Sequence, residues 1–121
     1  MMSETSCEDV FKVATRAAWQ AACRDGVFRG SDDDLRDGFV HLSARHQLLG
    51  TLERHFNGQA DLVLISFKSA DLGNALKWEP SRNGDLFPHL YAGLPTAAAR
   101  AVYDLTLGAD GVPLIPTDVI Q

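Results

Sequence analysis

Cysteine and clustered positive charge are what this 121-residue chain has least of. Its two cysteines are too few for a disulfide scaffold or a cysteine-rich zinc cluster. Lysine and arginine number 11 against 16 aspartates and glutamates, which gives a formal net charge of −5, and no basic run occurs. Non-specific nucleic-acid binding, which depends on a basic surface, is therefore not expected, whereas a small anionic ligand needs only local positive charge.

Long apolar runs and familiar catalytic motifs are also missing from the sequence. No run approaches the roughly 20 apolar residues of a membrane-spanning helix, and residues 1–9 are acidic without the apolar centre of a signal peptide. We therefore expect a cytoplasmic protein without membrane contact, in which residues 1–9 are a flexible tail and residues 10–121 form one domain. HExxH, CxxC and GxGxxG motifs are absent, so we expect no metal site.

The pattern of apolar residues predicts helices mainly in the first half of the chain and strands mainly in the second. Residues 10–14 indicate a strand, and residues 16–25 indicate a helix with Cys23 as a buried thiol. Residues 61–67 are apolar on both faces, which is typical of a central strand covered on both sides. Near the C-terminus, a turn and a returning strand at residues 112–115 indicate a hairpin. The mixture predicts an α+β fold with a mostly antiparallel or mixed sheet.

The stretch Gly38-Phe39-Val40-His41-Leu42-Ser43 is the centre of the chemistry that we expect. It predicts a short strand that leads into a helix. In a strand, side chains alternate between faces, so Val40 and Leu42 would point into the core and His41 into a cleft or solvent.

The helix expected after this strand adds a hydroxyl and a cation. Ser43 occupies its N-cap position, and Arg45 lies in its first turn. Together with His41, these residues and the free N–H groups of a helix start would form an anion site. The buried stripe of the helix is predicted to consist of Leu48, Leu49, Leu52 and Phe56.

An acidic run, Asp32-Asp33-Asp34, precedes the central stretch. Acidic residues suit the first turn of a helix, and no further ligand lies at a calcium-loop spacing. We therefore interpret the run as capping and solvated charge rather than as a metal site. His55, near the end of the next helix, is likewise interpreted as a solvated cap.

A second histidine of interest lies in Phe87-Pro88-His89-Leu90-Tyr91. Pro88 keeps this segment extended, so Phe87, His89 and Tyr91 share a face that could line an aromatic pocket. The alternative is a half-buried histidine that the backbone satisfies. In the first case His41 and His89 would face one cavity, because burial of the aliphatic residues beside each of them fixes the register of both strands.

Glu79 follows Trp78 directly. A carboxylate beside an apolar ring can have a raised pKa and serve as an acid or a base, or it can stabilise a sugar cation. The alternative interpretation is a surface glutamate at the end of a strand.

Several motifs, in the same order, resemble a bacterial family of small proteins known as domain of unknown function 952. The resemblance covers residues 10–116. The matching residues are Phe11-Lys12-Val13-Ala14, Trp19, Gly38-Phe39-Val40-His41-Leu42-Ser43, Gln47, Asp61-Leu62-Val63-Leu64, Trp78-Glu79, Phe87-Pro88-His89-Leu90-Tyr91-Ala92-Gly93-Leu94 and Asp110-Gly111. The departure is at Lys12, where the family has histidine; lysine keeps a cation but loses the ring's dual donor and acceptor character.

That family is similar to the ADP-ribosyltransferase superfamily. The similarity implies an α+β fold with a split, two-sheet β core, helices mainly from the N-terminal half, and an NAD cleft between the sheets. On this chain the positions that hold the ligand would be Lys12 and His41, with Ser43 and His89 nearby.

Two hypotheses for function follow from this resemblance. In the first, the chain is an enzyme or a relic enzyme that acts on NAD or another ADP-ribose compound, with either transferase-like or phosphotransferase-like activity. Lys12 and Arg45 would hold phosphate, His41 would bond the ribose, Tyr91 would stack on nicotinamide and Glu79 would stabilise the sugar cation. In the second, the chain is a binding module that has kept the cleft and lost the reaction. An inert structural or interaction protein is a third alternative, and the oligomeric state is left open.

Overall fold

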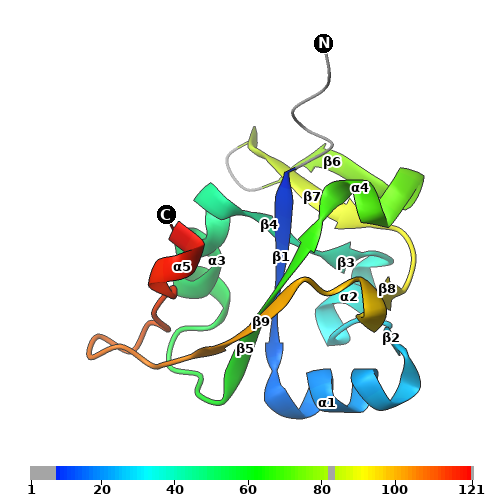
Figure 1. Cartoon of the computed structure of the whole chain (residues 1–121). Coiled ribbons are helices and arrows are strands. Elements are labelled where there is room, and N and C mark those ends of the chain that lie inside the picture. Colours follow the sequence, from blue (N-terminus) through cyan, green and yellow to red (C-terminus); the bar gives the residue numbers. More distant parts are fainter. Residues whose placement is uncertain (1–7, 82–83, 121) are drawn as a thin grey trace.

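The computed structural model describes residues 8–81 and 84–120 and has a mixed α+β fold whose strand pairs are all antiparallel (Figure 1). The strands are β1 (Asp9–Thr15), β2 (Val27–Phe28), β3 (Val40–His41), β4 (Ser43–Ala44), β5 (Leu62–Lys68), β6 (Leu76–Pro80), β7 (Leu86–Leu90), β8 (Leu94–Pro95) and β9 (Ala101–Leu105). The helices are α1 (Arg16–Asp25), α2 (Asp32–Asp37), α3 (Leu48–His55), α4 (Ser69–Leu72) and α5 (Thr117–Ile120). Helices α1, α2 and α3 lie in the first half and most strand residues in the second, as predicted, although the long strand β1 and three two-residue strands also occur in the first half.

The strands form one larger and two smaller sheets. The central sheet has the order β4-β1-β5-β9, a second sheet has the order β3-β7-β6, and β2 pairs with β8. β1 and β5 pair along their whole lengths, from Asp9 opposite Lys68 to Thr15 opposite Leu62. This long ladder is the frame on which the rest of the chain packs.

Burial on both faces makes β5 the centre of the protein. Val63, Ile65 and Phe67 belong to a core that also holds side chains of α1, β3 and β7. Leu62 and Leu64 point to the opposite face, into a second core beneath α3 and α5. Figure 1 shows α3 and α5 lying together on one side of the sheet. The prediction of a central strand covered on both sides is confirmed.

Local signals place α1 as predicted. The Thr15 side chain accepts a hydrogen bond from the Ala18 N–H, and Gly26 ends the helix in the left-handed conformation at φ 91°. Trp19 and Ala22 are buried, but Cys23 is exposed. The prediction of a buried thiol is wrong, because the contact of α1 with the core is limited to a narrow stripe.

Three further predictions need correction. Residues 112–115 do not return as a strand; only an isolated bridge joins Leu107 to Pro113, which has no N–H to extend a ladder. Leu49 is 53% exposed and is not part of the buried stripe of α3. Asp9 belongs to β1 and not to a tail, since Lys68 holds it in an ion pair at 2.8 Å. Residues 1–7 of that predicted tail lie outside the described residues.

No helix in the described ranges 8–81 and 84–120 is both long enough and apolar enough to span a membrane.

Candidate functional site

The chain passes from one sheet to the other at Leu42. β3, just before it, pairs with β7, and β4, just after it, pairs with β1. The Leu42 N–H donates to the carbonyl of Pro88 at 3.0 Å, which ties this crossing point to β7. In the part of the chain that the structure describes, β4 pairs only with Val10 and Phe11. From Phe11 to Val13, β1 borders a space that residues of both sheets line.

That space is a cavity of about 240 Å³ with a mixed polar and apolar wall. Residues from β1, β3, β4, β7, α2 and α3 meet there. The lining residues are Phe11, Lys12, Val13, Ser31, Asp33, Asp34, Arg36, Asp37, His41, Leu42, Ser43, Thr51, His55, Phe56, Ser81, Phe87 and His89.

His41 and His89 lie side by side in this wall. They are directly opposite each other in the β3–β7 ladder, and their ring centroids are 5.6 Å apart. The ring of Phe39 stacks on that of His89, with centroids 4.1 Å apart. The neighbouring Val40 and Leu90 are buried, so the alternation that fixes both registers does bring the two histidines to one cavity, as predicted.

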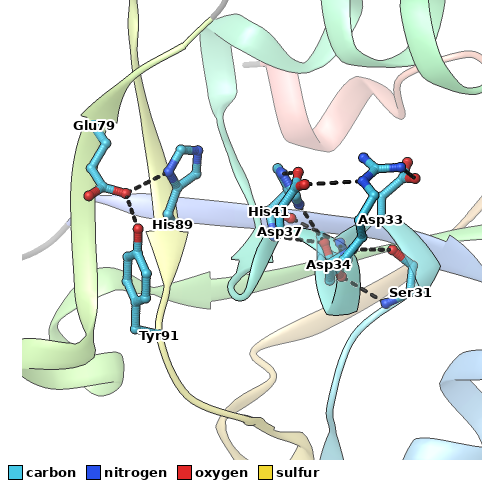
Figure 2. Close-up of polar contacts among 10 residues, drawn as sticks. Ser31, Asp33, Asp34, Asp37, His41, Glu79, His89 and Tyr91 are labelled. Atoms are coloured by element: carbon cyan, nitrogen blue, oxygen red, sulfur yellow. Dashed lines mark hydrogen bonds and ion pairs between the residues drawn. The ribbon is translucent and has the colours of Figure 1, made fainter.

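A carboxylate anchors His89. Glu79 Oε1 lies 2.8 Å from His89 Nδ1 and accepts a further hydrogen bond from the Tyr91 hydroxyl at 2.8 Å (Figure 2). These bonds, from His89 first and Tyr91 second, lower the pKa of Glu79 below its ordinary value. Of the two interpretations of Glu79, a raised pKa beside Trp78 is wrong, because donors and not the apolar ring dominate the surroundings of this carboxylate; Glu79 does lie near the end of a strand, β6.

The anchor sets the tautomer of His89. An ionised carboxylate only accepts hydrogen bonds, so Nδ1 must carry the proton, and in the neutral ring Nε2 is then an acceptor. Among the described residues no hydrogen bond to Nε2 is found, and no buried side-chain nitrogen lacks a partner, so Nε2 is accessible although most of the His89 side chain is buried. In its neutral form, His89 thus presents a hydrogen-bond acceptor of fixed orientation at the cavity wall.

We expect Tyr91→Phe to raise the pKa of Glu79. The substitution removes one of the two side-chain hydrogen bonds that favour the carboxylate over the acid. The Glu79 carboxyl signal, followed by NMR across a pH titration, measures this directly. Tyr103→Phe, at a tyrosine on β9, is the matched control and should leave the titration unchanged; a Tyr91→Phe curve that overlays the parent curve would contradict the assignment.

A second carboxylate, that of Asp34, anchors His41. Asp34 is 2% exposed, and its Oδ1 lies 2.7 Å from His41 Nδ1 and accepts from the His41 backbone N–H at 3.0 Å. Its Oδ2 accepts from Lys12 Nζ at 2.8 Å and from the Ser31 N–H at 2.9 Å. Burial alone would raise the pKa of Asp34, but the hydrogen bonds from His41 and Lys12 and the charge of Lys12 outweigh it, so the pKa lies well below its usual range.

The backbone before α2 makes room for Asp34. Gly30 has φ 128°, and a Cβ at this position would lie 2.6 Å from the Cβ of Asp34. Ser31 and Asp34 also form a reciprocal capping box at the start of α2. The interpretation of the acidic run as helix capping is confirmed for Asp34, but its interpretation as solvated charge is wrong, because Asp34 is buried and is the most highly connected carboxylate of the site.

The rim of the cavity carries paired charges. Asp37 Oδ2 lies 3.0 Å from His41 Nε2, and Arg36 contacts both Asp37 and Asp33. The hydrogen bond from Arg36 lowers the pKa of Asp37. Among the described residues, no group of three or more histidines, cysteines and acids is arranged to hold a metal ion.

Lys12 lines the cavity but is already engaged. Its ammonium is held by Asp34 and donates to the His41 carbonyl at 3.0 Å, above the ring of Phe28. Burial lowers the pKa of Lys12, and the Asp34 carboxylate opposes that effect. The residue therefore closes an internal ion pair instead of offering a free cation to a ligand.

The remaining predicted residues divide between the cavity and its surroundings. Ser43 lines the cavity, but it lies in β4 and its hydroxyl bonds that of Thr51 at 2.8 Å, so the predicted N-cap role is wrong. Arg45 does not line the cavity; it pairs with Asp9 at 2.5 Å and stacks over Phe11.

The expected helix start is also different, because a 3-10 turn at Arg45–Gln47 comes first, and the buried Gln47 side chain accepts from the Ala44 N–H at 2.9 Å. The predicted anion site at this position is therefore wrong. Glu79 and Tyr91 lie behind His89 and outside the cavity wall. His55, interpreted as a solvated cap, does reach the wall.

Sequence reasoning missed Asp34, Phe39 and Thr51 as parts of the site. Of these three, Asp34 had a signal in the sequence. Ser31 lies three residues earlier, which is the spacing of a capping box, and this spacing predicts that the Asp34 side chain turns back toward the start of α2.

Comparisons with known proteins agree with the fold. The sequence model of the family described as protein of unknown function (DUF952) matches residues 13–102. The crystal structure of protein CC0527 from Caulobacter crescentus is 45% identical, with a TM-score of 0.90 over 93% of this chain and 99% of that chain. The solution NMR structure of CC0527 is 48% identical, with a TM-score of 0.79 over 87% of this chain and 90% of that chain. No curated protein sequence matches significantly.

Proposed function

Because the chain belongs to the DUF952 family, whose description names no reaction, we propose a function from the chemistry of its site: the cavity of His41 and His89 binds the nicotinamide-ribose end of NAD or the terminal ribose of another ADP-ribose compound. The observation that carries the proposal is the anchored His89. Its Nδ1 is committed to Glu79, and Nε2 is left to accept a hydrogen bond from a hydroxyl such as that of a ribose.

The size of the cavity favours one end of the ligand. At about 240 Å³ it lies just below the range of roughly 300–1,000 Å³ that is typical of small-molecule sites. It accommodates a sugar or a single heteroaromatic ring, and the rest of a dinucleotide would extend over the rim. The apolar wall, including Phe11, Val13 and Phe87, suits a flat ring, while the hydroxyls of Ser43 and Thr51 suit a sugar.

The charges favour the same end. The cations nearest the cavity are engaged, Lys12 by Asp34 and Arg36 by Asp33 and Asp37. A pyrophosphate would have to displace one of these carboxylates. The acidic rim is instead compatible with the positive charge of an oxidised nicotinamide ring, or with the positive charge that develops on a ribose when its glycosidic bond breaks.

We further propose that the architecture is ADP-ribosyltransferase-like. Two observations support this. The strands form separate antiparallel sheets with a cavity between them, and Lys12 of the first strand and His41 both line that cavity. In such an enzyme His89 would accept a proton from, or hold, a ribose hydroxyl, and Glu79 would act by positioning His89 instead of touching the substrate.

The second candidate, a binding module without turnover, is favoured by one observation. Lys12 stands where the family resemblance has histidine, and it is locked in a buried pair with Asp34. A group held in this way cannot exchange a proton or bond a ligand without breaking that pair. Binding without turnover is the result that this second candidate requires.

Calorimetry with NAD, ADP-ribose and nicotinamide riboside tests the proposal. We expect NAD and nicotinamide riboside to bind, and His89→Ala to weaken binding at least tenfold, about 1.4 kcal/mol. His46→Ala is the matched control, since this exposed histidine does not line the cavity. Absence of binding at millimolar ligand would refute both candidates, and release of nicotinamide from bound NAD, measured by chromatography, separates the enzyme from the module.

A further inference from the structure

The free edge of the central sheet is a feature that the cavity does not involve. β9 is the outermost strand, and it pairs with β5 through residues 101–105 on one side only. In the described part of the chain, no strand pairs with its other side. In an antiparallel strand, alternate N–H and C=O groups point away from the neighbour, so this edge has a row of groups ready for another strand.

The edge strand of the second sheet, β6, is protected in a way that β9 is not. β6 contains Lys77, Glu79 and Pro80, and charged residues and proline are the usual means of blocking an edge. β9 has the sequence Ala-Val-Tyr-Asp-Leu; it lacks proline and lysine, and its one charged residue, Asp104, is already paired with Arg16. Its Val102 is 49% exposed, an unusual exposure for a β-branched side chain in a sheet.

The charges around β9 are arranged so that the edge complements itself. If two copies of β9 pair antiparallel about Val102, Val102 faces its own counterpart, and Arg100 of each copy faces Asp104 of the other. Val102 and Asp104 lie on one face of β9, and Arg100, which directly precedes the strand and bonds β5 through its backbone N–H, joins that face when the pairing extends the strand by one residue. A slip of the pairing by two residues would lose both of these opposite-charge pairs.

Existing ion pairs extend this complementarity. Asp104 already contacts Arg16 at 2.6 Å, and Arg100 contacts Asp71 at 3.3 Å. Pairing of the two copies would therefore bring the charges of Arg16, Asp104, Arg100 and Asp71 into a row of alternating sign on each side of the two-fold axis.

From this edge we infer that two copies of the chain associate through β9, forming one continuous antiparallel sheet across a two-fold axis. The contact is isologous, so it closes at a dimer and leaves no further edge of this kind. A strand of five residues provides an interface at the low end of the usual sizes, and we expect a reversible dimer with a dissociation constant on the order of 10–100 μM. The inference does not depend on the proposed ligand.

Sedimentation analysis of the full chain from about 1 μM to about 500 μM tests the inference. The parent chain should shift from monomer to dimer across this range. Val102→Lys places two like charges on the two-fold axis and should raise the dissociation constant at least tenfold. Leu35→Lys, at an exposed leucine on α2, is the matched control and should leave association unchanged.

Complementary charge reversals identify the register. Arg100→Asp and Asp104→Arg each create like-charge pairs with a second copy of the same variant, so each alone should be monomeric. An equal mixture of the two restores opposite charges at both positions and should form a mixed dimer. Circular dichroism confirms that the variants are folded. A parent chain that stays monomeric throughout, a dimer that Val102→Lys leaves intact, or a mixture that does not associate would overturn the inference.

Discussion

Asp34→Asn is expected to destabilise the folded chain by about 3–5 kcal/mol, because it leaves the buried Lys12 ammonium without a counter-ion. The new side chain keeps the shape of aspartate, so the loss measures charge and hydrogen bonding and not a cavity. Urea unfolding followed by circular dichroism gives the free energy of unfolding. Asp33→Asn, at an exposed position of the same helix, should change it by less than about 0.5 kcal/mol.

A double variant separates the ion pair from other roles of Asp34. Lys12→Met combined with Asp34→Asn removes both charges, so no uncompensated ion is buried and most of the lost stability should return. The backbone N–H groups of Ser31 and His41 donate to different oxygens of Asp34, so the single amide oxygen of the introduced asparagine can keep only one of these two bonds, and part of the loss should remain in the double variant. A loss below about 1 kcal/mol for Asp34→Asn alone would mean that the ammonium is neutral or solvated, contrary to the buried pair.

Acid unfolding provides a second measurement of the same substitution. The folded-state pKa of Asp34 is lowered, so its contribution is complete above the unfolded pKa of about 3.9 and is lost as the pH falls through the folded value. In that window the unfolded chain binds more protons than the folded chain, and stability falls with falling pH. Asp34→Asn removes this term, so its free energy of unfolding should depend less steeply on pH below about 5.

Leu52→Ala is expected to cost about 2–5 kcal/mol, the second large effect. Leu52 is fully buried on α3 and packs in the core beneath the central sheet with Leu48, Leu62 and Leu64. Removing three carbon atoms there loses their transfer free energy and leaves a cavity that the long β1–β5 ladder cannot easily close.

The chain contains its own control for this substitution. Leu49 lies three positions earlier on the same helix and is 53% exposed, so Leu49→Ala should change stability by less than about 0.5 kcal/mol. Both variants are measured by urea unfolding at one protein concentration. Equal losses at the two positions would contradict the placement of α3 on the sheet.

Local patterns in the sequence were sufficient to predict the elements whose structure depends on residues adjacent in the chain. The cap at Thr15, the end of α1 at Gly26 and the two-sided burial of β5 each follow from a few adjacent residues. The alternation around His41 and His89 was also sufficient to bring both rings to one cavity, because register follows from which side chains must be buried.

Features that depend on distant partners could not be predicted in this way. The role of Asp34 depends on Lys12, 22 positions earlier, and on burial that no local pattern reveals. Ser43 has the sequence context of a helix cap, but β1 provides an edge with which it pairs as a strand. The prediction that Arg45 reaches the cavity depends on its nearness to His41 in the sequence. In the structure β4 lies between the two residues, and the Arg45 guanidinium points to Asp9 instead of to the cavity.

The pairing of Lys12 with Asp34 also restricts how descendants of this protein can change. The free energy of unfolding of such domains is typically about 5–15 kcal/mol. A substitution that leaves one of these two buried charges without its partner therefore removes a large share of that stability. Gly30 adds a further restriction, since any larger residue there collides with Asp34. Substitution of one position at a time therefore passes through an intermediate that is destabilised by about 3–5 kcal/mol, and a lineage that has acquired this pair would tend to keep it after selection on the neighbouring cavity has ended.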